Sequence, residues 1–374
     1  GNAQFHLTDP RGASDKSGRT FNNPYQYFFE QMHMDDAIYA DESIYEYPMQ
    51  QGGGNDGRPY SFGRPSSGGS KAAYPCKSYG QGRINPAYFY GVFDPNDMRR
   101  DVSITMTGSN GKGVEKLIPF VPNSKAEGGG LTLNKWDENR QANPWVAAQR
   151  KSGINGPYMR MSEVYLGYAE VCAALGDVVT GKQYLKTVRE RSFPQGLANT
   201  DAFIASFGND LVRAIIEERG FEYAGEGDRR WTLIRSGYLP EDIKRIKDMT
   251  KAMMDGLATK GYYEFENGNI ISAYIWTKLV DAKTIYGHRL TAQCPTDKVN
   301  DPVLYPGWRG QKDNWEEMGL NYGSSTPATN LAIKGLFEIV SEEEAASLES
   351  QGYAKVNWGI DLVDYRDEYD KYLF

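Results

Sequence analysis

The feature that most constrains the fold of this chain is a run of helical periodicity between residues 160 and 237. Apolar side chains there recur at steps of three and four, which is typical of an amphipathic helix with one face against a core. The members of this stripe are Met161, Val164, Tyr165, Tyr168, Val171, Cys172 and Leu175. Gly176 and Asp177 end the helix, and Thr180 can cap a second one. The core face of the second helix is Tyr184, Leu185 and Val188.

Small residues at Ala169 and Gly181 allow these two helices to approach closely, so the pattern predicts a helical hairpin. A third helix follows and ends in a charged turn. Since one tetratricopeptide-like hairpin cannot bury its apolar face alone, we expect the rest of the chain to cover it.

Two charged motifs in this block resemble the signature of a known family. Residues 160–170 match R-x-x-E-V-Y-L-x-x-A-E, a pattern of the SusD/RagB family, the surface glycan-binding lipoproteins of bacterial nutrient-uptake systems. A longer match follows the run E-R-x-x-E-x-x-x-E-G-x-R-x-x-D-L-x-R, with Thr232 where an aspartate is usual. Its members here are Glu218, Arg219, Glu222, Glu226, Gly227, Arg229, Leu233 and Arg235. Residues 42–46 and 94–101 resemble two further family segments, so the resemblance covers most of residues 20–240.

The resemblance implies a mainly α fold, with a tetratricopeptide-like helical scaffold and a loop-rich lobe that contains short β-strands. It implies non-catalytic binding of oligosaccharide or polysaccharide and delivery to a SusC-like, TonB-dependent transporter. The expected location is the outer membrane, exposed at the cell surface. The only membrane attachment would be an N-terminal lipid outside this chain.

Family members also have a long helical N-terminal half and a closing P-I-P segment, and neither is recognisable here. We expect either a fragment of a family member or a natural short variant. Three regions are predicted along the chain: a loop-rich middle region of the family with short strands at 1–150, the helical hairpin and third helix at 151–240, and an irregular region with helices at 241–374.

Local patterns predict further elements. Alternation predicts a strand at Ser43–Tyr47, and strand-like pieces are expected at 102–107 and 116–122. A short helix is expected at 25–34 and a longer one at 241–257, and a third opens at Ser341 before three glutamates. Asn267-Gly268 predicts the turn of a hairpin within 261–279.

Charge and cysteine content exclude several classes of function. A net charge of −7 disfavours a nucleic-acid partner, because no basic excess is available to neutralise phosphates. Cys76, Cys172 and Cys294 have no paired spacing, so neither a zinc site nor a disulfide framework is predicted. Cys172 is expected in the core, and a single Cys76–Cys294 bridge is an alternative for an exported protein. We expect no metal and no other cofactor.

The charged run at 217–235 predicts a structural network, because its groups sit at helical spacing and can pair with one another or with backbone. Its expected members, with the preceding helix, are Arg160, Glu163, Glu218, Arg219, Glu222, Glu226 and Arg229. A glycosidase would need two carboxylates that face each other across a sugar, which sequence cannot show. We therefore expect no catalytic residues and no enzyme, and keep a glycoside hydrolase as a third hypothesis.

Aromatic residues beside polar ones are the candidates for glycan binding, since a flat ring can stack on the C–H face of a sugar. The predicted binding residues are Tyr88, Tyr90, Trp136, Asn139 and Trp145. Alanine at Trp136 or Trp145 is expected to weaken glycan binding without unfolding the protein. The alternative is that these rings fill the core under loops. The second hypothesis for function is a helical-repeat module that binds peptide or protein.

Overall fold

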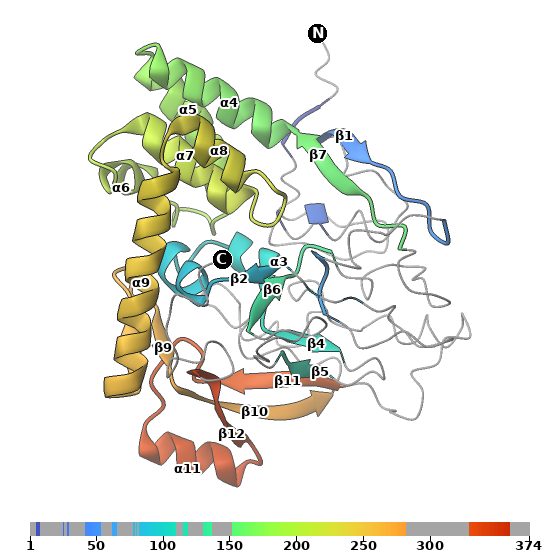
Figure 1. Cartoon of the computed structure of the whole chain (residues 1–374), viewed down its shortest axis with the longest axis vertical. Coiled ribbons are helices and arrows are strands. Elements are labelled where there is room, and N and C mark those ends of the chain that lie inside the picture. The colour runs from blue at the N-terminus through green and yellow to red at the C-terminus, as the bar shows by residue number, and fades with distance from the viewer. Residues whose placement is uncertain are drawn as a thin grey trace.

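The computed structural model describes the centre of the chain almost continuously and the remainder in part. The described residues are 5–7, 25, 28–29, 42–53, 62–65, 78, 80, 82–109, 115–118, 130–136, 152–281 and 329–359. The helices with their bounds are α3 (Arg99–Ser103), α4 (Met161–Ala174), α5 (Val178–Arg191), α6 (Thr200–Ala205), α7 (Leu211–Glu222), α8 (Arg229–Ser236), α9 (Leu239–Lys260) and α11 (Glu342–Ser350), besides one π-helical turn, η2 (Tyr88–Val92). Figure 1 shows α4 to α8 gathered at one end, with the long α9 running from them toward the opposite end.

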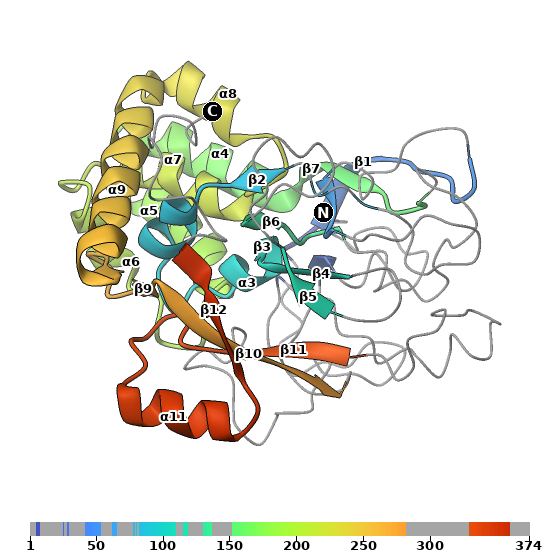
Figure 2. The ribbon, with the colours of Figure 1, turned by 60° about the horizontal axis from the view of Figure 1, so that its bottom comes forward.

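The strands are short, and β7 runs directly into α4 of this helical group, whereas β4, β5 and β10 to β12 lie away from it (Figure 1). They are β1 (Ser43–Tyr47), β2 (Arg83–Ile84), β3 (Ile104–Thr105), β4 (Thr107–Ser109), β5 (Glu115–Leu117), β6 (Leu131–Leu133), β7 (Gly156–Arg160), β8 (Tyr262–Glu264), β9 (Ile270–Ser272), β10 (Tyr274–Asp281), β11 (Thr329–Lys334) and β12 (Ala354–Asn357). The pairings are antiparallel and form the sheets β11-β10-β12, β2-β6-β3, β4-β5, β8-β9 and β1-β7. Figure 2 shows the β10 sheet and α11 at the end of the molecule opposite the hairpin of α4 and α5. The predicted mainly α scaffold with short strands is confirmed.

The helical hairpin forms as predicted, and small residues set its spacing. A Cβ added at Gly181 would lie 3.0 Å from the Ala169 carbonyl oxygen and 3.2 Å from the Ala173 nitrogen, so any larger residue would push the two helices apart. The turn differs in one detail. Asp177, and not Thr180, caps α5, because the Asp177 side chain accepts a hydrogen bond from the Thr180 backbone nitrogen at 3.1 Å.

The predicted core stripe of α4 is wrong for most of its members. Val164, Tyr168, Val171 and Leu175 are 41%, 49%, 54% and 81% exposed. The buried residues of α4 are Ser162, Leu166, Ala169 and Cys172. The helix is apolar on two sides, and its smaller side chains face α5 and α7, where the close approach requires them. Periodicity alone does not decide which of two apolar faces meets the core.

Several local predictions are confirmed. The strand at Ser43–Tyr47 forms with the expected bounds, and Ser341 caps α11 by accepting from the Glu344 backbone nitrogen at 3.2 Å. The hairpin β8–β9 turns at Gly268, whose φ is 84°. Helix α9 contains the predicted span and ends at Gly261, where φ is 80°. The described residues of the predicted 25–34 helix, at 25, 28 and 29, are helical.

Two expected strands at the centre of the chain need correction. Val102 and Ser103 belong to α3, and the strand region 102–107 is instead divided between that helix, β3 and β4. Of the strand expected at 116–122, β5 covers Glu115–Leu117 and ends before residue 118, while residues 119–122 lie outside the described part of the chain. Both arginines at the start of α3, Arg99 and Arg100, are buried.

The main hydrophobic core draws on all three predicted regions of the chain. It joins Phe89 and Tyr90 to Phe221, to Met253 and to Trp358. A second cluster packs around Trp136, and a third lies inside the helical group around Leu166 and Leu185. Cys172 is buried and unbridged, as predicted, whereas Cys76 and Cys294 lie outside the described residues. Across the described ranges, no helix combines the length and apolar character needed to cross a bilayer.

Candidate functional site

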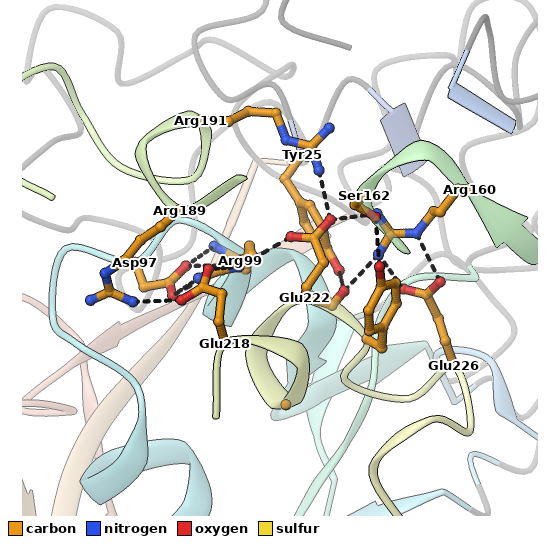
Figure 3. Close-up of polar contacts among 12 residues, drawn as sticks. Tyr25, Asp97, Arg99, Arg160, Ser162, Arg189, Arg191, Glu218, Glu222 and Glu226 are labelled. Atoms are coloured by element: carbon orange, nitrogen blue, oxygen red, sulfur yellow. Dashed lines mark hydrogen bonds and ion pairs between the residues drawn. The ribbon is translucent and has the colours of Figure 1, made fainter. Parts of the chain in front are cut away.

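Helix α7 carries a cluster of buried charges that joins five segments of the chain. Glu218 and Glu222 lie one turn apart on this helix, and both are fully buried. Glu218 accepts from Arg99 of α3 at 2.7 Å and from Arg189 of α5 at 2.8 Å. Arg99 also binds Asp97 at 2.7 Å. Figure 3 shows the arginines converging on the two glutamates from opposite sides.

Glu222 is held by three guanidinium groups. Its Oε2 is 3.1 Å from Arg99 Nη1, and its Oε1 is 2.6 Å from Arg191 Nη2. Arg160 Nη1 also donates to Oε1. Burial alone would raise the pKa of Glu222, but the charges of Arg160, Arg191 and Arg99 hold that pKa well below its ordinary value of 4.5. The carboxylate therefore remains ionised and is not a proton donor.

Arg160 joins this cluster to the two-stranded ribbon of β1 and β7, of which it is the last residue. Its Nη1 donates to Glu42 at 3.0 Å and to Ser162 Oγ at 2.7 Å. Its Nη2 donates to the Glu222 carbonyl oxygen at 2.7 Å and to Glu226 Oε1 at 2.9 Å, and its Nε donates to Glu226 Oε2 at 3.0 Å. The guanidinium also lies 4.6 Å from the centre of the Tyr223 ring. Every nitrogen of the group is thus satisfied inside the protein.

Lys135 is a second buried cation at the edge of the cluster. Its Nζ lies 2.6 Å from Glu226 Oε1 and 4.6 Å from the centre of the Phe29 ring. Burial lowers the pKa of Lys135 to about 8, although the Glu226 carboxylate opposes this shift. The contact holds the turn after α7 against the segment that follows β6.

The remaining charged residues of the motif form ion pairs on the outer side of α7. Arg219 binds Asp228 at 2.5 Å and Glu163 at 3.2 Å. Arg229 lies 3.0 Å from Glu217 and 2.9 Å from Asp242. The motif residues therefore contact one another and tie α4, α7, α8 and α9 together, which is the arrangement of a scaffold.

The predicted aromatic binding residues that the structure describes lie within the protein. Tyr90 and Trp136 are 0% exposed. The Tyr90 hydroxyl donates to the Leu336 carbonyl oxygen at 3.1 Å and accepts from Trp358 Nε1 at 3.0 Å. Tyr88 is half-buried and donates to the Gly220 carbonyl oxygen at 2.8 Å.

These positions match the alternative that such rings fill the core under loops. Neither face of Tyr90 or Trp136 is open to a ligand, so alanine at Trp136 would leave a cavity in the core. We therefore expect Trp136→Ala to destabilise the protein, contrary to the expectation from the sequence that this change leaves folding intact. Asn139 and Trp145 lie outside the described residues.

The exposed tyrosines of the β1–β7 ribbon were missed by the sequence reasoning. Tyr45, Tyr47 and Tyr158 are 57%, 55% and 66% exposed, and the Tyr158 ring contacts the rings of both Tyr45 and Tyr47. Alternation along Ser43–Tyr47 could have placed Tyr45 and Tyr47 on one face. No local signal pairs that strand with a segment more than 100 residues later.

Comparisons with known proteins agree on one family. The profile of the SusD family matches residues 8–306, which is most of the chain. The SusD-like protein P25 of Formosa agariphila is 28% identical over 160 residues, which span 42% of this chain and 26% of that protein.

Solved structures of the same family are similar to this chain at low identity. A SusD homologue from Bacteroides thetaiotaomicron is 19% identical, with a TM-score of 0.45, over 64% of this chain and 49% of that one. Surface glycan-binding protein A from Bacteroides thetaiotaomicron, in complex with laminarihexaose, is 18% identical, with a TM-score of 0.37, over 56% of this chain and 45% of that one. The chain thus spans about half or less of the length of these relatives. On the extent of the profile match, the chain belongs to the SusD family.

Proposed function

We propose that this protein binds oligosaccharide or polysaccharide at the cell surface and does not hydrolyse it. The observation that carries the proposal is membership of the SusD family over residues 8–306. The resemblance of residues 160–170 and 218–235 to the family signature implies glycan binding, and the charged residues of these segments tie several helices together.

The geometry of the charged cluster supports binding without hydrolysis. A glycosidase needs a carboxylic acid with a raised pKa, positioned to protonate the leaving oxygen. Glu218 and Glu222 are instead buried and paired with arginines, and the pKa of Glu222 is lowered. Neither of these two carboxylates reaches solvent, so the cluster stabilises the fold.

Delivery to a SusC-like, TonB-dependent transporter in the outer membrane is the second part of the proposal. It predicts that the protein co-purifies with such a transporter from outer membranes solubilised in mild detergent. Recovery of the native protein only from fractions without outer membrane would contradict this part and leave the binding activity to be judged separately.

Binding and hydrolysis can be tested together with the purified chain. In native gels cast with soluble polysaccharides, or by calorimetry, we expect retarded migration or heat of binding with at least one glycan. The panel should include starch, xylan, laminarin, polygalacturonate and alginate, and laminarihexaose as a defined oligomer. Long incubation should release no reducing sugar. Absence of binding to the whole panel would argue against glycan capture, and reducing-sugar release would indicate a hydrolase.

A protein- or peptide-binding module is the alternative that one observation favours. Val164, Tyr168, Val171 and Leu175 present an exposed apolar stripe along α4. A peptide library screened beside the glycan panel separates the two hypotheses. Peptide binding without any glycan binding would favour the alternative.

A further inference from the structure

We propose that Tyr45, Tyr47 and Tyr158 form an aromatic surface that binds a neutral glycan chain. This inference rests on the proposed function and names a site for it, on the ribbon formed by β1 and β7. Figure 1 shows this ribbon at the N-terminal end of α4, beyond the helical group.

The three rings are exposed and lie together. The Tyr45 and Tyr158 ring centres are 5.6 Å apart with an interplanar angle of 87°, and those of Tyr47 and Tyr158 are 6.1 Å apart at 53°. More than half of each residue is exposed. Monomeric proteins seldom leave contiguous apolar surface uncovered unless it binds something.

An irregularity in the strand pairing brings Tyr158 to the other two rings. Tyr45 pairs with Met159, whereas the next residue, Glu46, pairs with Pro157, so Tyr158 is the extra residue of a β-bulge. Bulges redirect a side chain and are frequent next to functional sites. Tyr47 pairs with Gly156, which has no side chain to cover the ring.

The ribbon is fixed at both ends by polar contacts. At one end, Ser43 pairs with Arg160, and the Arg160 guanidinium binds Glu42 within the charged cluster. At the other end, Asn155 Nδ2 donates to Glu46 Oε2 at 2.8 Å, and Asn155 Oδ1 accepts from the Met49 nitrogen at 2.8 Å. A surface held in this way loses little conformational entropy when a ligand binds.

The residue type favours a sugar over an aliphatic ligand. A tyrosine has a flat apolar ring and a polar tip, which suits a pyranose with C–H faces between hydroxyl groups. Within the part of the chain that the structure describes, no hydrogen bond uses the hydroxyl groups of Tyr45, Tyr47 or Tyr158, so all three can bond to a ligand.

Charge favours a neutral glycan. In residues 42–53 and 152–160 the charged side chains are Glu42, Glu46 and Arg160. Glu42 and Arg160 are buried in an ion pair with each other, and Glu46, which is half-buried, accepts from Asn155. Among these described residues, the surface strands of the ribbon thus carry no cation other than the buried Arg160, and the net charge of −7 of the chain disfavours uronate and sulfated chains.

The test is affinity electrophoresis and calorimetry of the full chain against starch, xylan and laminarin as neutral polysaccharides, and polygalacturonate and alginate as acidic ones. The variants are Tyr45→Ala, Tyr47→Ala, Tyr158→Ala and the triple change, with Trp231→Ala as the matched control. Trp231 is 67% exposed on α8, outside the ribbon. Circular dichroism should show unchanged thermal unfolding for all of them.

We expect the wild type to bind at least one neutral polysaccharide. Each single alanine variant should bind about tenfold more weakly, and the triple variant should lose binding, while Trp231→Ala retains it. Tyr158→Phe keeps the ring and should retain most of the affinity.

The outcomes separate this inference from the proposed function. Wild-type binding that survives the triple change overturns the site and leaves glycan capture intact. Binding confined to the acidic polysaccharides overturns the neutral class. A wild type that binds no polysaccharide overturns both proposals. A triple variant that loses only a peptide or protein ligand assigns the surface to a different class of partner and overturns the inference.

Discussion

Arg160 shows how much of this fold depends on a single side chain. It ends β7, immediately precedes α4, and donates to Glu42, Glu222 and Glu226 from within the core. A buried charge that has lost its partner is strongly destabilising, so the stability of each of these contacts depends on the others being formed. Removing one member should affect the whole cluster.

Glu222→Gln should destabilise the protein by about 3 kcal/mol or more, since the neutral amide leaves three arginines partly uncompensated. Urea unfolding followed by circular dichroism measures the change. Asp248→Asn is the control, because it removes an exposed partner of Lys244 on α9 and should have little effect. Equal stability of the two variants would show that the cluster contributes no more than a surface pair.

The lowered pKa of Glu222 also predicts how the stability of the protein changes with pH. Its pKa is lowered in the folded protein from an ordinary value of 4.5, so below that value the unfolded chain binds more protons. The stabilisation is present above the unfolded pKa and is lost as the pH falls through the folded pKa. Unfolding measured from pH 6 down to about pH 3 should show a loss of stability that is smaller in Glu222→Gln. If the free energy of unfolding fell equally with pH in the wild type and in Glu222→Gln, Glu222 would not be a source of the acid destabilisation.

Among the elements, the α4–α5 hairpin shows where sequence reasoning succeeds. Helix positions, the glycine at the close contact and the charged motif follow from local spacing. Local spacing does not show which face of α4 packs against the core. Leu166 and Val171 are both apolar, and the position of α7 decides which of them is buried. The tyrosine ribbon could not be predicted for a similar reason, since β1 and β7 are joined only by long-range pairing.

Two glycines of this hairpin form a matched pair for mutation. Gly181→Val should destabilise the protein by about 1–3 kcal/mol, because its side chain would meet the α4 backbone. Gly167→Ala meets nothing within 4 Å and should stabilise α4 by up to about 1 kcal/mol. Thermal and urea unfolding of both variants measure the difference. A stabilising effect of Gly181→Val would mean that the helices are farther apart than described.

For the molecule as a whole, the main hydrophobic core contains residues from all three regions predicted along the chain, 1–150, 151–240 and 241–374. Phe89, Phe221 and Trp358 belong to one cluster, so the predicted sequence regions share their hydrophobic core. Tyr90 is the polar link in this core, because its hydroxyl group bonds both Leu336 and Trp358.

Tyr90→Phe should therefore destabilise the protein by about 1–3 kcal/mol, since Trp358 Nε1 is left buried without its acceptor. Tryptophan fluorescence and circular dichroism should report the same lowered unfolding midpoint, as expected for a shared core. Tyr274→Phe is the control, because Tyr274 is 41% exposed. Different midpoints for the two probes would indicate that the C-terminal sheet unfolds separately.

The contacts of Arg160 also dictate an order of events during synthesis. Its partners Glu42 and Glu222 lie 118 residues before it and 62 residues after it. When β7 leaves the ribosome, the carboxylates of α7 do not yet exist, so the guanidinium has only part of its final set of partners. The base of the tyrosine ribbon can therefore be completed only after α7 has been translated. Contacts between segments this distant form slowly, and the ribbon should be among the later parts of the molecule to become rigid.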